Sequence, residues 1–299
     1  MIRKHAFLIM SHHRMDILVE LLKSLDDKRC DIYIHIDKKC QEQLCIQLNY
    51  SKIYFVKPMD VRWGDYSQIK CELMLLREAN KRQSYEYYHL ITGASFPIKN
   101  NNYIYEFFEQ NKGYEFIGFD NAQNYSERIA YYYWFTKIGK PNKRLDYLKI
   151  RIRNMVIGIQ KKISFSRIKD TNLVIKKGLA YWSITDECAN YILNNDKLIK
   201  KLFKYSFCGD EVFVQTLVYN SNFKKHIFSY DNEFKGCLCF TTWDESIGER
   251  EGHCFLSGDY KNIAASECLF ALKFDGSDGI ELINKIKSEL LDNGNQTYC

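Results

Sequence analysis

The chain has 299 residues, of which 46% are hydrophobic, and it carries a formal net charge of +6. This apolar content is enough for one large core or two closely packed lobes, and only 3 prolines and 15 glycines argue against long disordered linkers. The mild positive charge is compatible with an anionic partner, and the lack of an apolar run of about 18 residues predicts that no helix crosses a membrane.

The N-terminal half alternates strand-like and helix-like patterns. Apolar or period-two runs predict strands at residues 5–10, 31–37, 52–56, 87–92 and 115–119. Leucines at helical spacing predict a helix after the first strand, with Asp16 as its cap, and Ser67 is expected to cap a second helix. Strands and helices in alternation predict an α/β sandwich with a mainly parallel central sheet.

Polar residues follow three of these predicted strands. They are Ser11-His12-His13, Asp37-Lys38-Lys39 and Gly93-Ala94-Ser95. Ligands of parallel sheets bind beyond the carboxyl ends of the strands. We therefore expect the three segments to line one cleft.

The segment 137–169 differs from the rest of the chain, because it contains eleven lysines and arginines, and Asp146 is its only acid. Apolar residues are interleaved with the charges, which predicts a basic amphipathic helix or helix pair. One interpretation is a solvated helix that packs through its apolar stripe. The alternative is contact with an anionic membrane surface.

Two further segments contain residues that could carry chemistry. Asp210 and Glu211 begin an apolar run suited to a helix, where an acid pair is often only a cap and a partner of the helix dipole. A carboxylate there could instead act as a general base. Lys273 lies within the apolar run 269–274. It could be a surface lysine with a buried stem, but its apolar neighbours favour an anionic partner.

With these segments placed, the chain resembles the core-2/I-branching β-1,6-N-acetylglucosaminyltransferase family, which also contains the peptide O-xylosyltransferases. The resemblance runs through residues 5–38, 61–67, 88–99, 178–182, the Asp210-Glu211 segment, Trp243 and 269–274. It implies a GT-A-like, Rossmann-type fold in a single catalytic domain over residues 1–299, with 137–169 as an insertion. It also implies an inverting mechanism with a UDP-sugar donor and no divalent metal or other cofactor. The sequence contains no Asp-x-Asp, the usual metal-bridging signature of GT-A enzymes.

The resemblance also assigns roles to individual residues. Glu211 matches the catalytic base, while Asp210 is expected to cap or orient. The donor-binding residues that it implies are His12 and Asp37 at the uracil and ribose end, and Arg250 and Lys273 on the diphosphate. We also expect Trp63 at the donor, because its flat apolar face suits a sugar ring, although Trp63 could instead be a core residue. On the acceptor side, Trp243 matches an aromatic residue near the acceptor sugar, and Ser95 stands where the family commonly has an acid.

The function implied is transfer of a sugar to a hydroxyl of a glycan acceptor, in bacterial surface-polysaccharide assembly. N-acetylglucosamine is the sugar expected by family, and xylose or galactose are alternatives. A second class is a non-catalytic nucleotide-sugar or glycan-binding protein, which the joint presence of Glu211, Arg250 and Lys273 disfavours. A third is a nucleic-acid-binding protein that uses residues 137–169; only charge supports it.

The cysteines and the N-terminus bear on location. The 11 cysteines form no CxxC pair and accompany no histidine pattern, which argues against a zinc site. No signal peptide is apparent before the first strand pattern, so we expect a cytoplasmic protein with reduced thiols. Contact of 137–169 with the inner face of the plasma membrane would bring the protein to a lipid-linked acceptor.

Overall fold

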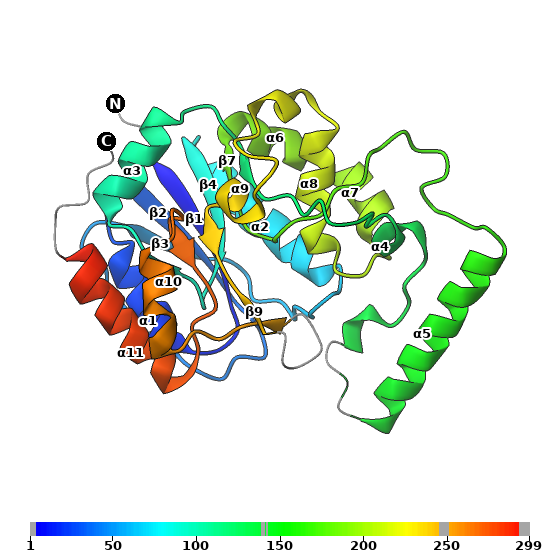
Figure 1. Ribbon diagram of the computed structural model, residues 1–299, viewed down its shortest axis with the longest axis horizontal. Coiled ribbons are helices and arrows are strands. Elements are labelled where there is room, and N and C mark those ends of the chain that lie inside the picture. The colour runs from blue at the N-terminus through cyan, green and yellow to red at the C-terminus, as the bar shows by residue number, and fades with distance from the viewer. Residues whose placement is uncertain (1–3, 139–140, 142, 245–250, 293–299) are drawn as a thin grey trace.

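A six-stranded sheet with the order β3-β2-β1-β4-β7-β6 forms the centre of the computed structural model, which describes residues 4–138, 141, 143–244 and 251–292 (Figure 1). β1 to β4 run parallel, and β7 runs antiparallel to both of its neighbours. The predicted α/β class with a mainly parallel sheet is therefore confirmed. The strands are β1 (His5–Ser11), β2 (Cys30–Ile36), β3 (Lys52–Phe55), β4 (Tyr87–Thr92), β6 (Phe116–Ile117) and β7 (Trp182–Thr185).

Burial on both faces explains why β1 reads as a continuous apolar run. Phe7 and Ile9 belong to the hydrophobic core on one face of the sheet, whereas Ala6 and Leu8 belong to the core on the other. The alternation follows from the period of two along a strand. The helices that bury the first face are α1 (Met15–Ser24), α3 (Asn101–Gln110), α10 (Tyr260–Ala264) and α11 (Gly276–Ile286). Those on the second are α2 (Ser67–Arg82), α6 (Asp186–Asn194), α7 (Asp196–Phe203) and α8 (Phe213–Tyr219).

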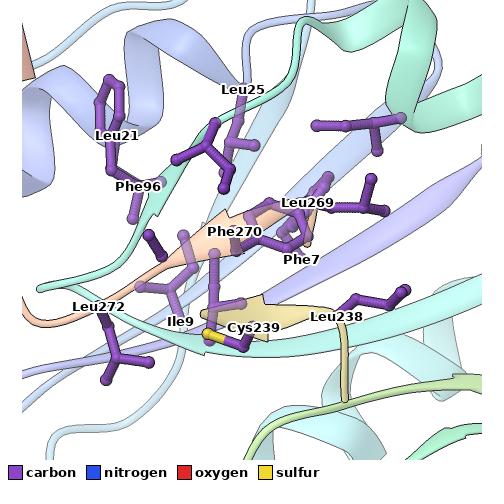
Figure 2. Close-up of a cluster of buried hydrophobic side chains, with 14 of the residues drawn as sticks. Phe7, Ile9, Leu21, Leu25, Phe96, Leu238, Cys239, Leu269, Phe270 and Leu272 are labelled. Atoms are coloured by element: carbon purple, nitrogen blue, oxygen red, sulfur yellow. The ribbon is translucent and has the colours of Figure 1, made fainter. Parts of the chain in front are cut away.

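A small second sheet joins the C-terminal part of the chain to the first face. Its order is β5-β11-β8, with β8 parallel and β5 antiparallel to β11. Figure 2 shows how Phe270 of β11 and Cys239 of β8 pack beside Phe7 and Ile9 of β1. The strands are β5 (Phe96–Pro97), β8 (Cys239–Phe240) and β11 (Phe270–Ala271), and the hairpin β9 (Trp243–Asp244) and β10 (Glu251–Gly252) follows β8.

Two predicted caps are corrected by the structure. Asp16 lies in the first turn of α1, where Arg14 binds it, and the carboxylate of Glu42 accepts the N–H groups of Arg14 and Met15 instead. Ser67 is the first residue of α2, and Asp65 accepts its backbone N–H. In both places a residue outside the helical pattern satisfies the first N–H groups.

The basic segment forms one long helix rather than a pair. α5 (Arg144–Lys162) lies at the edge of the molecule, at the right of Figure 1. The short helices α4 (Glu127–Ala130) and α9 (Glu233–Cys237) lie nearer the sheet. Among the helices in the described ranges, none is long and apolar enough to cross a membrane.

Candidate active site

The loops after β1 and β2 meet through Asp37. Its backbone N–H donates to the carbonyl of Ser11 at 2.8 Å, which joins the two strand ends. The buried carboxylate accepts the backbone N–H of Val61 at 2.9 Å and forms an ion pair with Lys39 at 2.7 Å. Burial opposes ionisation of Asp37, but the hydrogen bonds from Lys39 and Val61 outweigh it and lower the pKa. Asp37 is therefore an ordered anion at the sheet edge.

His12 and Lys273 join the same group. The ring of His12 is exposed and stacks on that of His13, with centroids 4.1 Å apart. Partial desolvation and the charge of His13 lower the pKa of His12, and the charges of Asp37 and Lys273 also act on it. Lys273 follows β11, and Phe274 donates its N–H to Ala94 at 3.0 Å, so the turn after β4 adjoins it. As predicted, the ends of β1, β2 and β4 come together, and the C-terminal strand adds a cation.

The segment 61–68 links this group to the Asp210-Glu211 turn. Its first residue binds Asp37, and the carbonyl of Gly64 accepts the N–H of Cys208 at 3.0 Å. The side-chain amide of Gln68 donates to Asp210 at 2.7 Å. The turn itself is a short 3-10 helix, Gly209–Glu211, which precedes α8. The acids therefore lie before the α-helix and not in it.

Glu211 lies between two cations. Arg128 of α4 donates to its Oε2 at 2.5 Å, and the ammonium of Lys177 lies 3.7 Å from the same oxygen. Lys177 also pairs with Asp120 at 3.3 Å. The side chain of Glu211 keeps 30% of its surface exposed. This geometry holds the carboxylate in one orientation and leaves it accessible.

Asp210, the neighbour of Glu211, interacts with a second buried carboxyl group, that of Glu72. Burial, and then the charge of Glu211, raise the pKa of Asp210; burial, and then Asp210, raise the pKa of Glu72 well above its usual value. Asp210 Oδ1 and Glu72 Oε2 are buried, and neither has a hydrogen-bond partner within the described part of the chain. The neutral acid is the form that such surroundings favour. Asp210 is thus suited to orienting its neighbour rather than to taking a proton itself.

The remaining predicted site residues have different surroundings. Trp63 is 56% exposed and meets Phe207 edge-on, and Trp243 in β9 is 37% exposed. Ser95 is fully buried and its hydroxyl contacts Thr92, so we do not keep it as an acceptor contact. Arg250 lies outside the described residues.

A cavity of about 490 Å³ adjoins Lys177. Its lining includes Asp120, Asn121, Asn124, Tyr125 and Lys177. Tyr125 donates to Asp120, and Lys177 lies 5.0 Å over the Tyr125 ring. Amide, carboxylate and phenol groups around a hollow suit a ligand with many hydroxyl groups.

A comparison with protein-family models identifies the family of the chain. The model described as Branch: Core-2/I-Branching enzyme matches residues 5–262, which include His12, Asp37 and the Glu211 turn, whereas Lys273 lies beyond the matched range. The chain belongs to the Core-2/I-branching enzyme family. It is therefore a glycosyltransferase, and its sheet is consistent with the GT-A fold of that family. A search of curated proteins found no match.

Three residues of this candidate site were not expected from the sequence. Arg128 and Lys177 bind Glu211, and Asp120 binds Lys177. Lys177 directly precedes the motif 178–182 that carried part of the resemblance, so its position was a usable signal. Arg128 and Asp120 lie in segments without a recognisable pattern. Within the described ranges, no group of three His, Cys, Asp or Glu side chains is arranged to hold a metal ion.

Proposed function

We propose that this branching-enzyme relative is an inverting glycosyltransferase. It would move a sugar, N-acetylglucosamine by family, from UDP to a hydroxyl of a glycan acceptor without a divalent metal. The observation that carries the proposal is Glu211, a part-exposed carboxylate held by Arg128 and Lys177 next to the carboxyl edge of the sheet. The chemistry needs a group that takes a proton and groups that receive a leaving diphosphate.

Glu211 supplies the first requirement. Both cations contact Oε2, and among the residues described no hydrogen bond to Oε1 is found. In the proposed step Oε1 accepts the proton of the acceptor hydroxyl while the hydroxyl oxygen bonds to the anomeric carbon. The bond from that carbon to the diphosphate breaks on the opposite face, and its electron pair leaves with UDP. An α-linked donor then gives a β-linked product.

Lys273 and Arg250 supply the second. Charge-assisted hydrogen bonds from an ammonium and a guanidinium can neutralise a departing diphosphate in place of a metal. Lys273 is half-buried beside His12, where an anion would be partly desolvated. Asp37 Oδ2 accepts from Val61 and retains a lone pair for a ribose hydroxyl. His12 and Trp63 complete the proposed donor side.

The acceptor is assigned to the Glu211 side. Trp243 offers a flat apolar face for a sugar ring, and the cavity beside Lys177 supplies polar groups. We place the reaction in bacterial surface-polysaccharide assembly on the cytoplasmic side, with a lipid-linked glycan as acceptor. Two alternatives remain for experiment. The donor sugar could be xylose or galactose, or the protein could bind the nucleotide sugar without transferring it.

Calorimetric titration of UDP in the presence of EDTA tests the donor side. Wild type should bind UDP, and Lys273→Met should bind at least about tenfold more weakly, because it loses a charged hydrogen-bond partner. Lys285→Met is the matched control. Lys285 belongs to α11 and lies over the ring of Tyr260 in α10, so it has no part in the proposed donor site. Metal-dependent binding, or equal affinity of wild type and Lys273→Met, would contradict the proposed donor site.

A further inference from the structure

α5 presents a stripe of exposed apolar side chains. Successive members are three or four positions apart, so they share one face of the helix. Each keeps at least 36% of its surface exposed. The stripe consists of Leu145, Leu148, Ile152, Met155 and Ile159.

The rest of the protein contacts a different side of α5. Arg153 lies 4.9 Å over the ring of Phe207, and Lys161 pairs with Glu127 at 2.7 Å. Gln160, the buried residue of the helix, accepts the N–H of Tyr132 at 2.9 Å. These contacts fix the helix to the molecule and leave the apolar stripe exposed.

Positive charge surrounds the stripe. Arg144, Lys149 and Arg151 lie next to it along the helix, and Asp146, the one acid of α5, accepts the N–H of Lys143 at the helix start. A basic cavity of about 520 Å³ adjoins the C-terminal end of α5, because Tyr132, which binds Gln160, also lines it. Four lysines of α7 and the turn that follows, together with Arg167, contribute to that cavity: Lys197, Lys200, Lys201 and Lys204.

We propose that the apolar stripe of α5 docks on the surface of an anionic lipid bilayer. A helix with an apolar face and lysines or arginines beside it lies in the plane of the membrane, with the apolar face among the headgroups and upper acyl chains. Flanking cations pair with acidic headgroups, and each contributes further affinity.

Charge decides between a membrane and a second copy of the chain. The spacing of the stripe would suit a coiled coil, but the flanking positions on both helices would then be Arg144, Lys149 and Arg151. Like charges would face one another across such an interface. An anionic bilayer offers the opposite charge and no shape requirement.

Docking has a consequence for the active site. Arg153 holds α5 against Phe207, which lies four residues before Glu211. The docking helix is therefore joined to the segment that leads into the Glu211 turn. The docking inference does not rest on the proposed chemistry, although it would explain how a lipid-linked acceptor is reached.

Co-sedimentation with vesicles tests the inference. Wild type is mixed at low salt with vesicles of phosphatidylglycerol and phosphatidylcholine, or of phosphatidylcholine alone. We expect binding to the anionic vesicles at least about tenfold tighter than to the neutral ones, and release by high salt. The Glu211→Gln variant should bind like wild type, which separates membrane docking from catalysis.

Two triple variants separate the stripe from its charges. One replaces Leu148, Ile152 and Met155 by Gln, which keeps the net charge and a good helix propensity. The other replaces Arg144, Lys149 and Arg151 by Gln. Each should reduce binding at least about tenfold. The matched control replaces Lys23 of α1, Lys28 of the turn after α1, and Lys52 of β3 by Gln, and should bind as wild type does. The elements α1 and β3 lie at the opposite side of Figure 1 from α5.

Three results would overturn the proposal. If wild type does not bind anionic vesicles at low salt, the protein has no membrane-docking surface. Equal binding of wild type and the Leu148, Ile152 and Met155 variant leaves the stripe without a role. A lipid-free dimer, detected by light scattering and dissociated by that variant, would show that a second copy covers the stripe.

Discussion

At the scale of single residues, the orientation of the Glu211 carboxylate is set by the two cations that contact it. Arg128 and Lys177 both approach Oε2, from elements that are distant in sequence. A base works only when its free oxygen lies within hydrogen-bonding reach of the proton that it takes. Arg128 therefore acts as a positioning residue for the proposed reaction.

Replacing Arg128 by Met should reduce kcat by about 10- to 100-fold, the scale of one hydrogen bond to a charged group. The KM for the donor should stay within about threefold, because Arg128 contacts the base. Arg128→Lys, which keeps the charge, should recover part of the loss. Steady-state kinetics measure both constants, with Arg82→Met, at the exposed end of α2, as control. A raised KM with normal kcat would place Arg128 on the substrate instead.

At the scale of elements, the close approach of two backbones supports the Glu211 turn. A Cβ added to Gly178 would lie 1.9 Å from the carbonyl oxygen of Gly118, and the N–H of Gly178 donates to the carbonyl of Glu211 at 2.9 Å. The backbone at Gly178 cannot move aside without shifting that turn. Glycine at 178 is thus required by space.

Gly178→Ala should lower the free energy of unfolding by about 1–3 kcal/mol, the usual cost of overpacking, and should also reduce turnover. The matched control is Gly158→Ala in α5, where no heavy atom lies within 4 Å of the added Cβ. That change should be neutral or stabilise by up to about 1 kcal/mol. Urea unfolding of both variants measures the difference, and equal stability would contradict the described packing.

The junction of β6 and α6 predicts a pH dependence of stability. Glu115 is buried and accepts the N–H and hydroxyl of Thr185, and burial raises the pKa of Glu115 to about 7. The folded state therefore binds this proton more tightly than the unfolded chain does. The resulting stabilisation is fully present below about pH 4.5 and is lost as the pH rises to about 7.

Unfolding free energies of wild type and Glu115→Gln, measured from pH 5 to pH 8, isolate this contribution. The difference between the two proteins should shrink by a few kcal/mol over that range, since one pKa unit corresponds to about 1.4 kcal/mol. Glu281→Gln, at an exposed position of α11, should follow wild type at every pH. A constant difference between wild type and Glu115→Gln would contradict the raised pKa.

Long elements were predictable from sequence, and short ones were not. The apolar runs of β1 and β4 determine strands by burial alone. The two-residue strands β5, β8 and β11 form only because distant segments pair with one another. The cap of α1 comes from Glu42, far along the chain, so no local pattern indicated it.

At the scale of the whole molecule, the sheet topology predicted half of the site. Residues that follow parallel strands must meet at one edge, and His12 and Asp37 do so with Lys273 beside them. The other half depends on packing around Glu211. Arg128 and Lys177 reach it from α4 and from the segment before β7, and their meeting is a property of the folded chain.

The proposed reaction unites these two halves. UDP would be held at the Lys273 side, and the acceptor would be deprotonated at Glu211. Donor binding and proton transfer should then be separable by mutation, since different residues carry them. Chelation of divalent metals should impair neither.

The most direct test is sugar transfer by wild type and by Glu211→Gln in excess EDTA, with a panel of UDP-sugars and NMR of the product. We predict transfer by wild type with formation of a β-linkage. Glu211→Gln should bind UDP normally and turn over at least about 10²-fold more slowly. A strict requirement for Mg²⁺ or Mn²⁺, an α-linked product, or near-normal turnover of Glu211→Gln would contradict the mechanism.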